Sequence, residues 1–401
     1  MKVLVMYEYP PLPAGLSTQG ELLRKGLREI GIEAYGVHLK SDQEKEWYYR
    51  WFQPDLAVGV GYWGYTPHLV LHTQQAGAAQ PVPWLVADGY IANYREVLNS
   101  LPLILVTSTW VKDVYVRDGI APDIIEVLPV GCDTDTFRPR EVHEPKVAIA
   151  REIMGVPMDE VMLLTVGGDA ASKGSQEVMR ALALLGDAVP KWRYVCKVWP
   201  QARTTSQNQS DLGLAEELGI IDKVRYVTGK VSRDFMPYLM NACDIYCGPS
   251  RLEGFGMPQV EAGACGKPVI GTRAMAFLDT LVHGETAFLA GVAVENRVSE
   301  TILGEESGYP EGHRVVFDSP RVADYRANVS EIAEYLRQLL CDPSLRQRMG
   351  EAGRKRAVAR YDYRAVARQF VDIVSRRLGV EVPREISQAS YNLNEGDLVA
   401  T

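Results

Sequence analysis

Two glutamates separated by seven residues flank a glycine-containing turn in the second half of the 401-residue chain. Glu253 precedes the turn at 254–256, and Glu261 lies inside a helix that we expect to begin near Pro258. The apolar residues 243–247 before them are typical of a short buried strand. A strand, a glycine turn and a helix N-terminus together present free backbone N–H groups, which bind anions. Because ionised carboxylates only accept hydrogen bonds, this combination favours a ligand with hydroxyl groups beside its phosphates, such as a sugar nucleotide.

This stretch resembles the E-x7-E signature of family 4 retaining glycosyltransferases, which have the GT-B fold; it reads EGFGMPQVE and continues AGACGKPVIG. The resemblance implies an α/β protein with two Rossmann-like domains that face each other across a cleft. It also implies a C-terminal helix that crosses back to the N-terminal domain. The implied activity is that of a metal-independent hexosyltransferase. Such an enzyme moves a sugar from a nucleotide-activated donor to a hydroxyl acceptor, with retention, by a front-face mechanism.

The same resemblance implies roles for the residues of the stretch. Glu253 would be a catalytic carboxylate over the donor sugar, and Glu261 would accept hydrogen bonds from the nucleotide ribose. Backbone N–H groups of the turn would contact the distal phosphate. The donor-binding residues expected around the turn are Gly254, Phe255, Gly256 and Met257. Retaining glycoside hydrolases instead need two carboxylates about 5 Å apart across one bond, so the two glutamates are not interpreted as a hydrolase pair.

Three basic residues are candidates for holding the donor diphosphate. Lys173 follows a predicted strand and a glycine-containing loop, where the family has a lysine that would neutralise the leaving group. The family usually adds an arginine directly after that strand, but this sequence has Gly168 there. Either Lys197, at the end of the next predicted strand, or Arg251 could supply the missing charge. The sequence leaves that choice open.

The N-terminal half offers fewer candidates. Gly15 remains in the loop after the first strand, where the family usually has two adjacent glycines near the donor phosphates and the acceptor. Many relatives have a histidine after the strand that corresponds to 84–87, but this sequence has Asp88 there. Asp88 could bind a sugar hydroxyl or orient the acceptor nucleophile, and we count it as a catalytic candidate. His68 and His72 are interpreted as a helix-surface pair rather than as a catalytic base.

Strand and helix patterns alternate through both halves, which predicts two open parallel sheets. The N-terminal, acceptor-side domain is expected at 1–138 and the nucleotide-sugar domain at 147–361. The last helix, at about 362–378, would return to the first domain, and 380–401 would form a polar tail. The segment 294–326 breaks the alternation and is interpreted as an insertion, either functional or inert.

Composition restricts the location and the partners. The net charge of -8 gives no basic field for a nucleic acid, and no apolar run approaches the roughly 20 residues of a membrane-spanning helix. The N-terminal apolar stretch is too short for a signal peptide, and the six cysteines are interpreted as buried free thiols, so we expect a cytoplasmic protein. Arginine-rich C-terminal helices could approach an anionic membrane, although solvated helix faces are the favoured interpretation. The sequence does not predict an oligomeric state.

Two alternatives to a transferase stay open. One is a catalytically silent sugar-nucleotide-binding protein, since the family's arginine and histidine are both absent. The other is a GT-B phosphorylase or epimerase, although no pyridoxal phosphate signature is found. We expect no cofactor beyond the nucleotide sugar as substrate and no metal. The donor is expected to be UDP- or GDP-linked rather than ADP-linked, with the sugar and the hydroxyl acceptor undetermined.

Overall fold

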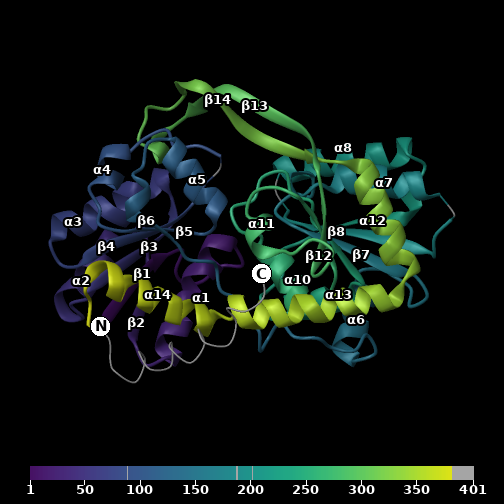
Figure 1. The fold of residues 1–401 in the computed structure, drawn as a ribbon, viewed down its shortest axis with the longest axis horizontal. Coiled ribbons are helices and arrows are strands. Elements are labelled where there is room, and N and C mark those ends of the chain that lie inside the picture. Colours follow the sequence, from purple (N-terminus) through teal and green to yellow (C-terminus); the bar gives the residue numbers. More distant parts are fainter. Residues whose placement is uncertain (88, 187, 201, 382–401) are drawn as a thin grey trace. The chain divides into compact units, whose positions relative to one another are not determined.

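The computed structural model describes residues 1–87, 89–186, 188–200 and 202–381, and the chain divides into two compact units (Figure 1). Unit 1 contains Met1–Asp133, Ser299–Pro320 and, of the described residues that follow, 360–381. Unit 2 contains Thr134–Val298 and Arg321–Ala359. Each unit has one six-stranded sheet, and a separate pair of strands forms a long hairpin.

The sheet of unit 1 is parallel throughout, in the order β2-β1-β3-β4-β5-β6. Its strands are β1 (Lys2–Tyr7), β2 (Glu33–His38), β3 (Leu56–Tyr62), β4 (Gln80–Val86), β5 (Ile104–Val106) and β6 (Ile125–Val127). Its helices are α1 (Gly15–Glu29), α2 (Asp42–Trp51), α3 (His72–Ala76), α4 (Arg95–Asn99), α5 (Thr109–Arg117) and α14 (Tyr363–Leu378). Short 3-10 or π turns lie at Trp63–Tyr65, Pro67–Leu71 and Pro122–Ile124. Strands covered on both faces need apolar residues at every position, which explains uninterrupted runs such as 3–6.

The last helix, α14, packs against α1 within unit 1. The close approach requires Gly26, because a Cβ atom there would lie 2.5 Å from the Tyr363 carbonyl oxygen. The Tyr363 hydroxyl donates to Glu29 Oε1 at 2.7 Å, and Arg364 Nε lies 2.7 Å from Glu29 Oε2. The returning C-terminal helix expected from the sequence is therefore present.

The sheet of unit 2 is also parallel, in the order β12-β11-β10-β7-β8-β9. Its strands are β7 (Val161–Val166), β8 (Trp192–Val198), β9 (Val224–Thr228), β10 (Ile245–Cys247), β11 (Val269–Thr272) and β12 (Ala287–Ala290). Its helices are α6 (Pro145–Ile153), α7 (Ser175–Leu185), α8 (Ala202–Glu217), α9 (Met236–Ala242), α10 (Met257–Ala264), α11 (Phe277–Thr280), α12 (Val329–Cys341) and α13 (Pro343–Arg356). Short 3-10 or π turns lie at Ala171–Lys173, Ile221–Lys223 and Ala357–Tyr361. The two Rossmann-like α/β domains predicted from the sequence are both present.

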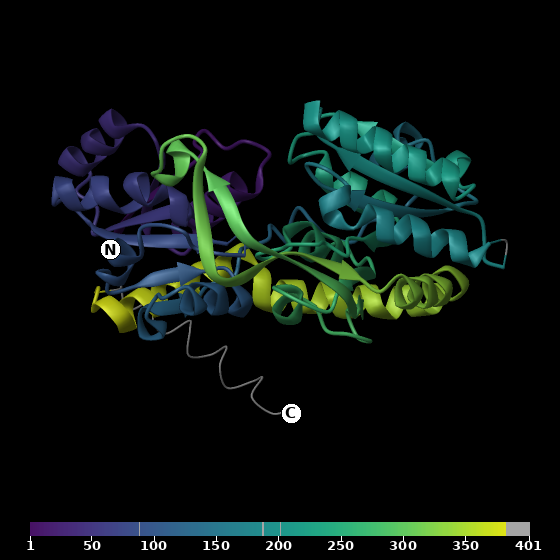
Figure 2. The same ribbon diagram turned by 90° about the horizontal axis from the view of Figure 1, so that it is seen from above.

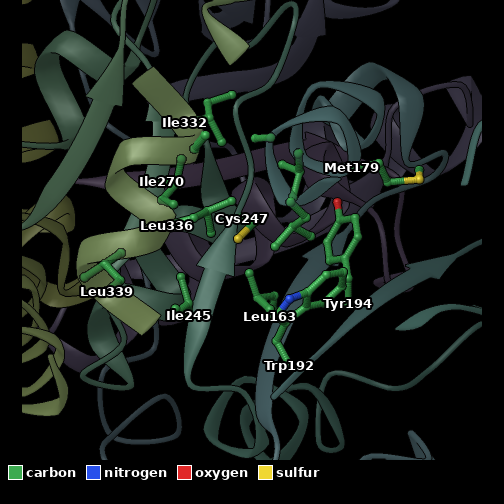
Figure 3. Packing of buried hydrophobic residues seen from close by; sticks show 14 of the residues in the cluster. Leu163, Met179, Trp192, Tyr194, Ile245, Cys247, Ile270, Ile332, Leu336 and Leu339 are labelled. Carbon is green, nitrogen blue, oxygen red and sulfur yellow. The ribbon is translucent and has the colours of Figure 1, made fainter. Parts of the chain in front are cut away.

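One face of the unit 2 sheet packs against α7 and α12 through a continuous apolar cluster (Figure 3). Trp192, Tyr194 and Cys196 of β8 all belong to this cluster, together with Leu336 of α12. Side chains alternate between the two faces of a strand. Lys197, which follows Cys196, therefore lies on the opposite face of β8.

The segment 294–326, which interrupts the alternation, is a hairpin of two long strands (Figure 2). Strands β13 (Val292–Leu303) and β14 (His313–Ala327) pair as a two-stranded sheet, with a 3-10 turn at Glu305–Ser307 between them. Most side chains of both strands are exposed or half-buried. Neither face therefore shows the period-two apolar pattern that identifies a half-buried strand, which is why these strands were not predicted.

The cysteines differ in one respect from the expectation. Five of them are buried free thiols, but Cys341, the last residue of α12, is exposed. Its neighbours on the inner side of α12, Leu339 and Leu340, are buried, so the thiol faces outward simply by helical position. In the part of the chain that is described, no helix is long and apolar enough to cross a membrane.

Candidate active site in unit 2

The turn between β10 and α10 is fixed by the backbone of Gly256. Gly256 precedes the first residue of α10 with φ +90°, a conformation that favours glycine. A Cβ atom at this position would also lie 2.7 Å from the Phe277 ring. The Gly256 N–H donates to Glu253 Oε1 at 3.2 Å, so the carboxylate is bonded to the backbone of the turn. Of the other predicted donor-binding residues here, Gly254 and Phe255 form the turn and Met257 begins α10.

Lys173 and Glu253 are brought together from two loops. Lys173 Nζ lies 2.7 Å from Glu253 Oε2, and both side chains are largely buried. Burial by itself would lower the pKa of Lys173, but the adjacent Glu253 carboxylate outweighs that effect and raises the pKa above its ordinary value. The lysine is therefore charged at neutral pH and carries a carboxylate as its partner. Among the predicted residues, these two form the centre of the candidate site.

Two glycines allow the Lys173 loop to pack tightly. A Cβ atom on Gly167 would lie 2.8 Å from Lys173 Cγ. Gly174 has φ +82°, and a Cβ atom there would lie 2.3 Å from the Pro249 carbonyl oxygen. Arg251 N also donates to the Ser172 carbonyl oxygen at 2.9 Å. The loop after β7 and the loop after β10 are thus in direct backbone contact.

Glu261 is buried inside α10 and faces an arginine that the sequence analysis did not single out. Glu261 is 3% exposed, and its Oε1 lies 2.7 Å from Arg233 Nη2. The Arg233 guanidinium also lies over the Phe137 ring, 4.9 Å from its centroid. Within the described residues, Glu261 Oε1 receives no hydrogen bond of good geometry, so it keeps capacity to accept from a ligand hydroxyl. The only sequence signal for Arg233 was its place after β9, at the strand edge where ligands bind in open α/β sheets.

Arg251 is held by an internal partner. Its Nη2 lies 3.0 Å from both carboxylate oxygens of Glu177 and donates to Gln176 Oε1 at 3.0 Å. Glu177 is buried in α7 and also lies 3.4 Å from Arg326 Nη1. The charge of Arg251 is therefore neutralised within the protein, which disfavours it as a free cation for a ligand.

Lys197 differs from Arg251 in having no charged partner among the described residues. It is 3% exposed, and it makes no side-chain hydrogen bond or ion pair with any other residue that the structure describes. Burial lowers the pKa of Lys197 below its ordinary value. Its backbone is tied to the glycine loop, since Gly167 N donates to the Lys197 carbonyl oxygen at 3.1 Å and Trp199 N donates to the Gly168 carbonyl oxygen at 3.0 Å. A buried ammonium without a counter-charge is costly, so an anion that reached Lys197 would relieve that cost.

The predicted site residues of unit 1 provide less evidence for a ligand site. Gly15 is the first residue of α1, directly after the loop that follows β1. Asp88 lies outside the described residues. His68 and His72 lie in the π turn after β3 and at the start of α3, and the pKa of each is lowered by burial and by the nearby Lys45 ammonium.

Several arginines of the C-terminal helices bond inward. Arg354 Nη1 donates to the carbonyl oxygens of Thr134 and Phe137 at 2.9 and 2.7 Å, and Arg356 Nε donates to that of Thr280 at 3.0 Å. Arg364 pairs with Glu29, as described above. These residues serve the packing of α13 and α14, so they need neither a membrane nor a solvated face to explain them. Across the described ranges, no group of three or more His, Cys, Asp or Glu side chains could hold a metal ion.

The fold is similar to those of several solved structures. HepE of Anabaena, solved in complex with UDP and glucose, superimposes with a TM-score of 0.68 at 15% identity, covering 94% of this chain and 99% of that one. Sucrose-phosphate synthase of Thermosynechococcus elongatus gives 0.70 at 17% identity, covering 95% and 100%. WaaG, a glycosyltransferase involved in lipopolysaccharide biosynthesis, gives 0.60 at 16% identity, covering 94% and 100%. The fold is GT-B.

Known families and proteins match parts of this sequence. Residues 147–303, which include Lys173, Lys197, Glu253 and Glu261, match the family model of glycosyl transferases group 1. MMP alpha-(1->4)-mannosyltransferase of Mycolicibacterium hassiacum is 27% identical over 292 residues, which are 72% of this chain and 58% of that protein. D-inositol 3-phosphate glycosyltransferase of Acidothermus cellulolyticus is 30% identical over 191 residues, 46% of this chain and 41% of that protein. The chain thus spans about half the length of the curated relatives it matches.

Proposed function

We propose that this GT-B protein is a retaining glycosyltransferase that moves a hexosyl group from a nucleotide-activated donor to a hydroxyl acceptor without a metal ion. The observation that carries the proposal is the contact of Lys173 with Glu253 beside the N-terminus of α10. It places a cation suited to a phosphate next to a carboxylate suited to a sugar. The match of residues 147–303 to the group 1 family model supports the same conclusion.

The donor would occupy the carboxyl edge of the unit 2 sheet. Its diphosphate would contact Lys173 and the backbone of the turn, and its ribose hydroxyls would donate to Glu261. We assign the second cation to Lys197, because Arg251 is already paired with Glu177. The buried, unpaired ammonium of Lys197 would gain a counter-charge when the diphosphate binds.

The reaction follows from this placement of charges. The bond between the anomeric carbon and the diphosphate oxygen breaks, and negative charge develops on that oxygen, where the two lysines stabilise it. Positive charge develops on the sugar, where the Glu253 carboxylate stabilises it. The acceptor oxygen forms the new bond on the same face of the sugar, and its proton passes to the departing phosphate oxygen. Rate enhancement would then come from charge stabilisation and positioning.

The choice of donor bases and sugars to test is supported by the comparisons rather than by contacts. The complexes of HepE with UDP and UDP-glucose make a UDP-linked donor the first to test, ahead of GDP- and ADP-linked ones. The similarity to a mannosyltransferase adds mannose to the sugars tested. We also propose a cytoplasmic location, since Cys196, Cys243, Cys247, Cys265 and Cys341 are free thiols.

Thermal shifts with UDP-, GDP- and ADP-linked glucose and mannose test the proposal. A ligand at 100 times its Kd adds about 2.7 kcal/mol to the stability of the folded state. The stabilising donor is then incubated without acceptor, and slow release of nucleoside diphosphate with an α-configured sugar from an α-linked donor is expected. Glu253→Gln serves as the control for the catalysed part of that release. Stabilisation without any release would support a silent sugar-nucleotide-binding protein, and no stabilisation by any donor would overturn the proposal.

A further inference from the structure

The base of hairpin β13–β14 is bonded directly to the candidate donor site in unit 2. Tyr325 N, in β14, donates to the Arg251 carbonyl oxygen at 2.7 Å, two residues before Glu253. The next residue, Arg326, contacts Glu177, the same buried carboxylate that holds the Arg251 guanidinium. Asn296 Nδ2 of β13 donates to Asp324 Oδ1 at 2.8 Å and joins the two strands at this end.

Arg251 is the junction of these contacts. Its N–H bonds to Ser172, its carbonyl oxygen accepts from Tyr325, and its guanidinium is held by Glu177. One residue therefore connects the loop that carries Lys173, the turn that carries Glu253, and the hairpin. A displacement of the hairpin base would therefore move both charged residues of the candidate site, Lys173 and Glu253.

The end of the same hairpin belongs to unit 1 and is held there by the loop after β4. The Tyr90 and Phe317 rings have centroids 5.0 Å apart, and the Tyr90 hydroxyl lies 3.1 Å from Thr301 Oγ1. The Tyr309 hydroxyl donates to the Ala92 carbonyl oxygen at 2.8 Å, and Asn93 Nδ2 donates to that of Ser307 at 3.0 Å. These contacts fix the loop 89–94, which follows directly on the position of the acceptor-side candidate Asp88.

Close packing makes this attachment specific. Gly308 has φ +76°, and a Cβ atom there would lie 1.9 Å from the Tyr94 hydroxyl oxygen, so only glycine fits. Next to the contact residues Thr301 and Phe317, the side chains of Ile302 and Val316 are 73% and 67% exposed, so the opposite side of the hairpin end is open to solvent. Between the base and the end, Arg321 and Val322 are also buried, so the hairpin is packed along part of its length as well.

We infer that hairpin β13–β14 is a positioning strap that couples loop 89–94 of unit 1 to the donor turn of unit 2. Ordering of the turn by a ligand would be transmitted through Arg251, Tyr325 and the paired strands to the loop beside the acceptor-side position. The role of the ligand rests on the proposed function, whereas the mechanical coupling does not. Coupling between two sites is reciprocal in free energy, so release of the hairpin end should loosen the donor turn.

Amide hydrogen exchange on the whole protein tests the coupling without any ligand. Two variants release the hairpin end: the double substitution Tyr90→Phe/Tyr309→Phe, and a shortened hairpin in which 299–320 is replaced by an Asn-Gly turn. Tyr49→Phe is the matched control, because it removes a buried hydroxyl contact with Thr73 in unit 1 and touches no hairpin residue. Exchange at 251–254 should rise about fivefold or more in both hairpin variants and stay unchanged in the control. If exchange rises at 89–94 alone, the hairpin is only a local support and the inference is wrong.

A second arm uses UDP and GDP as probes. In the parent, the nucleotide that binds should protect both 251–254 and 89–94 from exchange. In the shortened variant it should protect 251–254 alone, with nucleotide affinity within about threefold of the parent, a difference smaller than one hydrogen bond. Equal protection of 89–94 in both proteins would overturn the coupling. If neither nucleotide binds the parent, the proposed function fails, and the ligand-free exchange decides the strap by itself.

Discussion

The carboxyl edges of the two parallel sheets carry different chemistry. In unit 2 the described loops bring together oppositely charged side chains at short range, Lys173 with Glu253 and Arg233 with Glu261, both at 2.7 Å. In unit 1 the loops after β3 and β4 bear aromatic rings, and Trp63 and Tyr90 lie with centroids 6.3 Å apart. Fixed charges suit a phosphate and a developing ionic state, whereas rings and hydroxyls suit a neutral sugar. Under the proposed function, the bond-breaking chemistry would therefore lie in unit 2, and unit 1 would contact the acceptor.

The largest expected effect is that of Glu253→Gln, which removes charge from the centre of the unit 2 site and leaves its shape. Loss of one preorganised electrostatic group commonly costs a factor of about 10² or more in kcat. Because the carboxylate acts where charge develops, kcat and kcat/KM should fall together. Steady-state kinetics with the donor found by thermal shift measure this, and melting temperatures check folding. A change confined to the donor KM would remove Glu253 from the reacting centre.

Lys197→Met tests whether the buried ammonium is a phosphate ligand. A hydrogen bond to a charged group contributes about 1.5–3 kcal/mol, so affinity for UDP or GDP should fall by about 10- to 100-fold. Calorimetric titration of the nucleoside diphosphate provides the measurement.

A second substitution sharpens the Lys197 test. A Cβ atom on Gly168 would lie 3.5 Å from the Trp199 ring, which is ordinary van der Waals contact, so the position accepts a side chain. Gly168→Arg added to Lys197→Met should therefore restore much of the lost affinity, because a cation returns to the same loop. Gly168→Gln in the same background is the uncharged control. Unchanged affinity of the Lys197→Met variant would contradict the assignment of Lys197 as the second cation.

Glu261→Gln should separate ribose binding from chemistry. The contact exists in the ground state and the transition state alike, so its loss raises the donor KM while kcat is nearly kept. One hydrogen bond contributes about 0.5–1.5 kcal/mol, which corresponds to a KM increase of roughly 2- to 10-fold. Donor-dependent kinetics measure it beside Glu253→Gln. Equal and small effects of both substitutions would contradict the assignment of the whole stretch.

The smallest expected effect is a pH dependence of stability with opposite signs at the two lysines. The pKa of Lys173 is raised in the folded state, so its ion pair contributes fully below the unfolded value near 10.5 and is lost as pH rises through the folded value. The pKa of Lys197 is lowered, so the folded state releases that proton first and stability rises with pH up to about 10.5. The difference in unfolding free energy between the parent and the Lys173→Met variant should fall as pH rises through the alkaline range. The difference between the parent and Lys197→Met should rise below pH 10.5, and slopes of the same sign would contradict the two environments described here.

The sequence alone determined the two parallel sheets and the turn between the glutamates, and the physical reasons are local. Strands buried on both faces must be apolar at nearly every position, and a glycine turn followed by Pro258 announces the start of α10. The hairpin was not predicted because most of its side chains are exposed or half-buried and show no period-two alternation. The spacing of apolar residues and the residues typical of turns indicate only which side chains each segment buries.

Which charged residues pair with each other depends on the tertiary structure. Lys173 and Glu253 are 80 residues apart in the chain, and Arg251 and Glu177 are 74 apart, so no spacing in the sequence relates them. The sequence left Lys197 and Arg251 as equal candidates for one role. Folding neutralised Arg251 with a buried carboxylate and left Lys197 without one, because parallel strands bring loops from distant parts of the chain to a single edge. Which of the two cations keeps a carboxylate partner is a property of that edge and not of any local sequence.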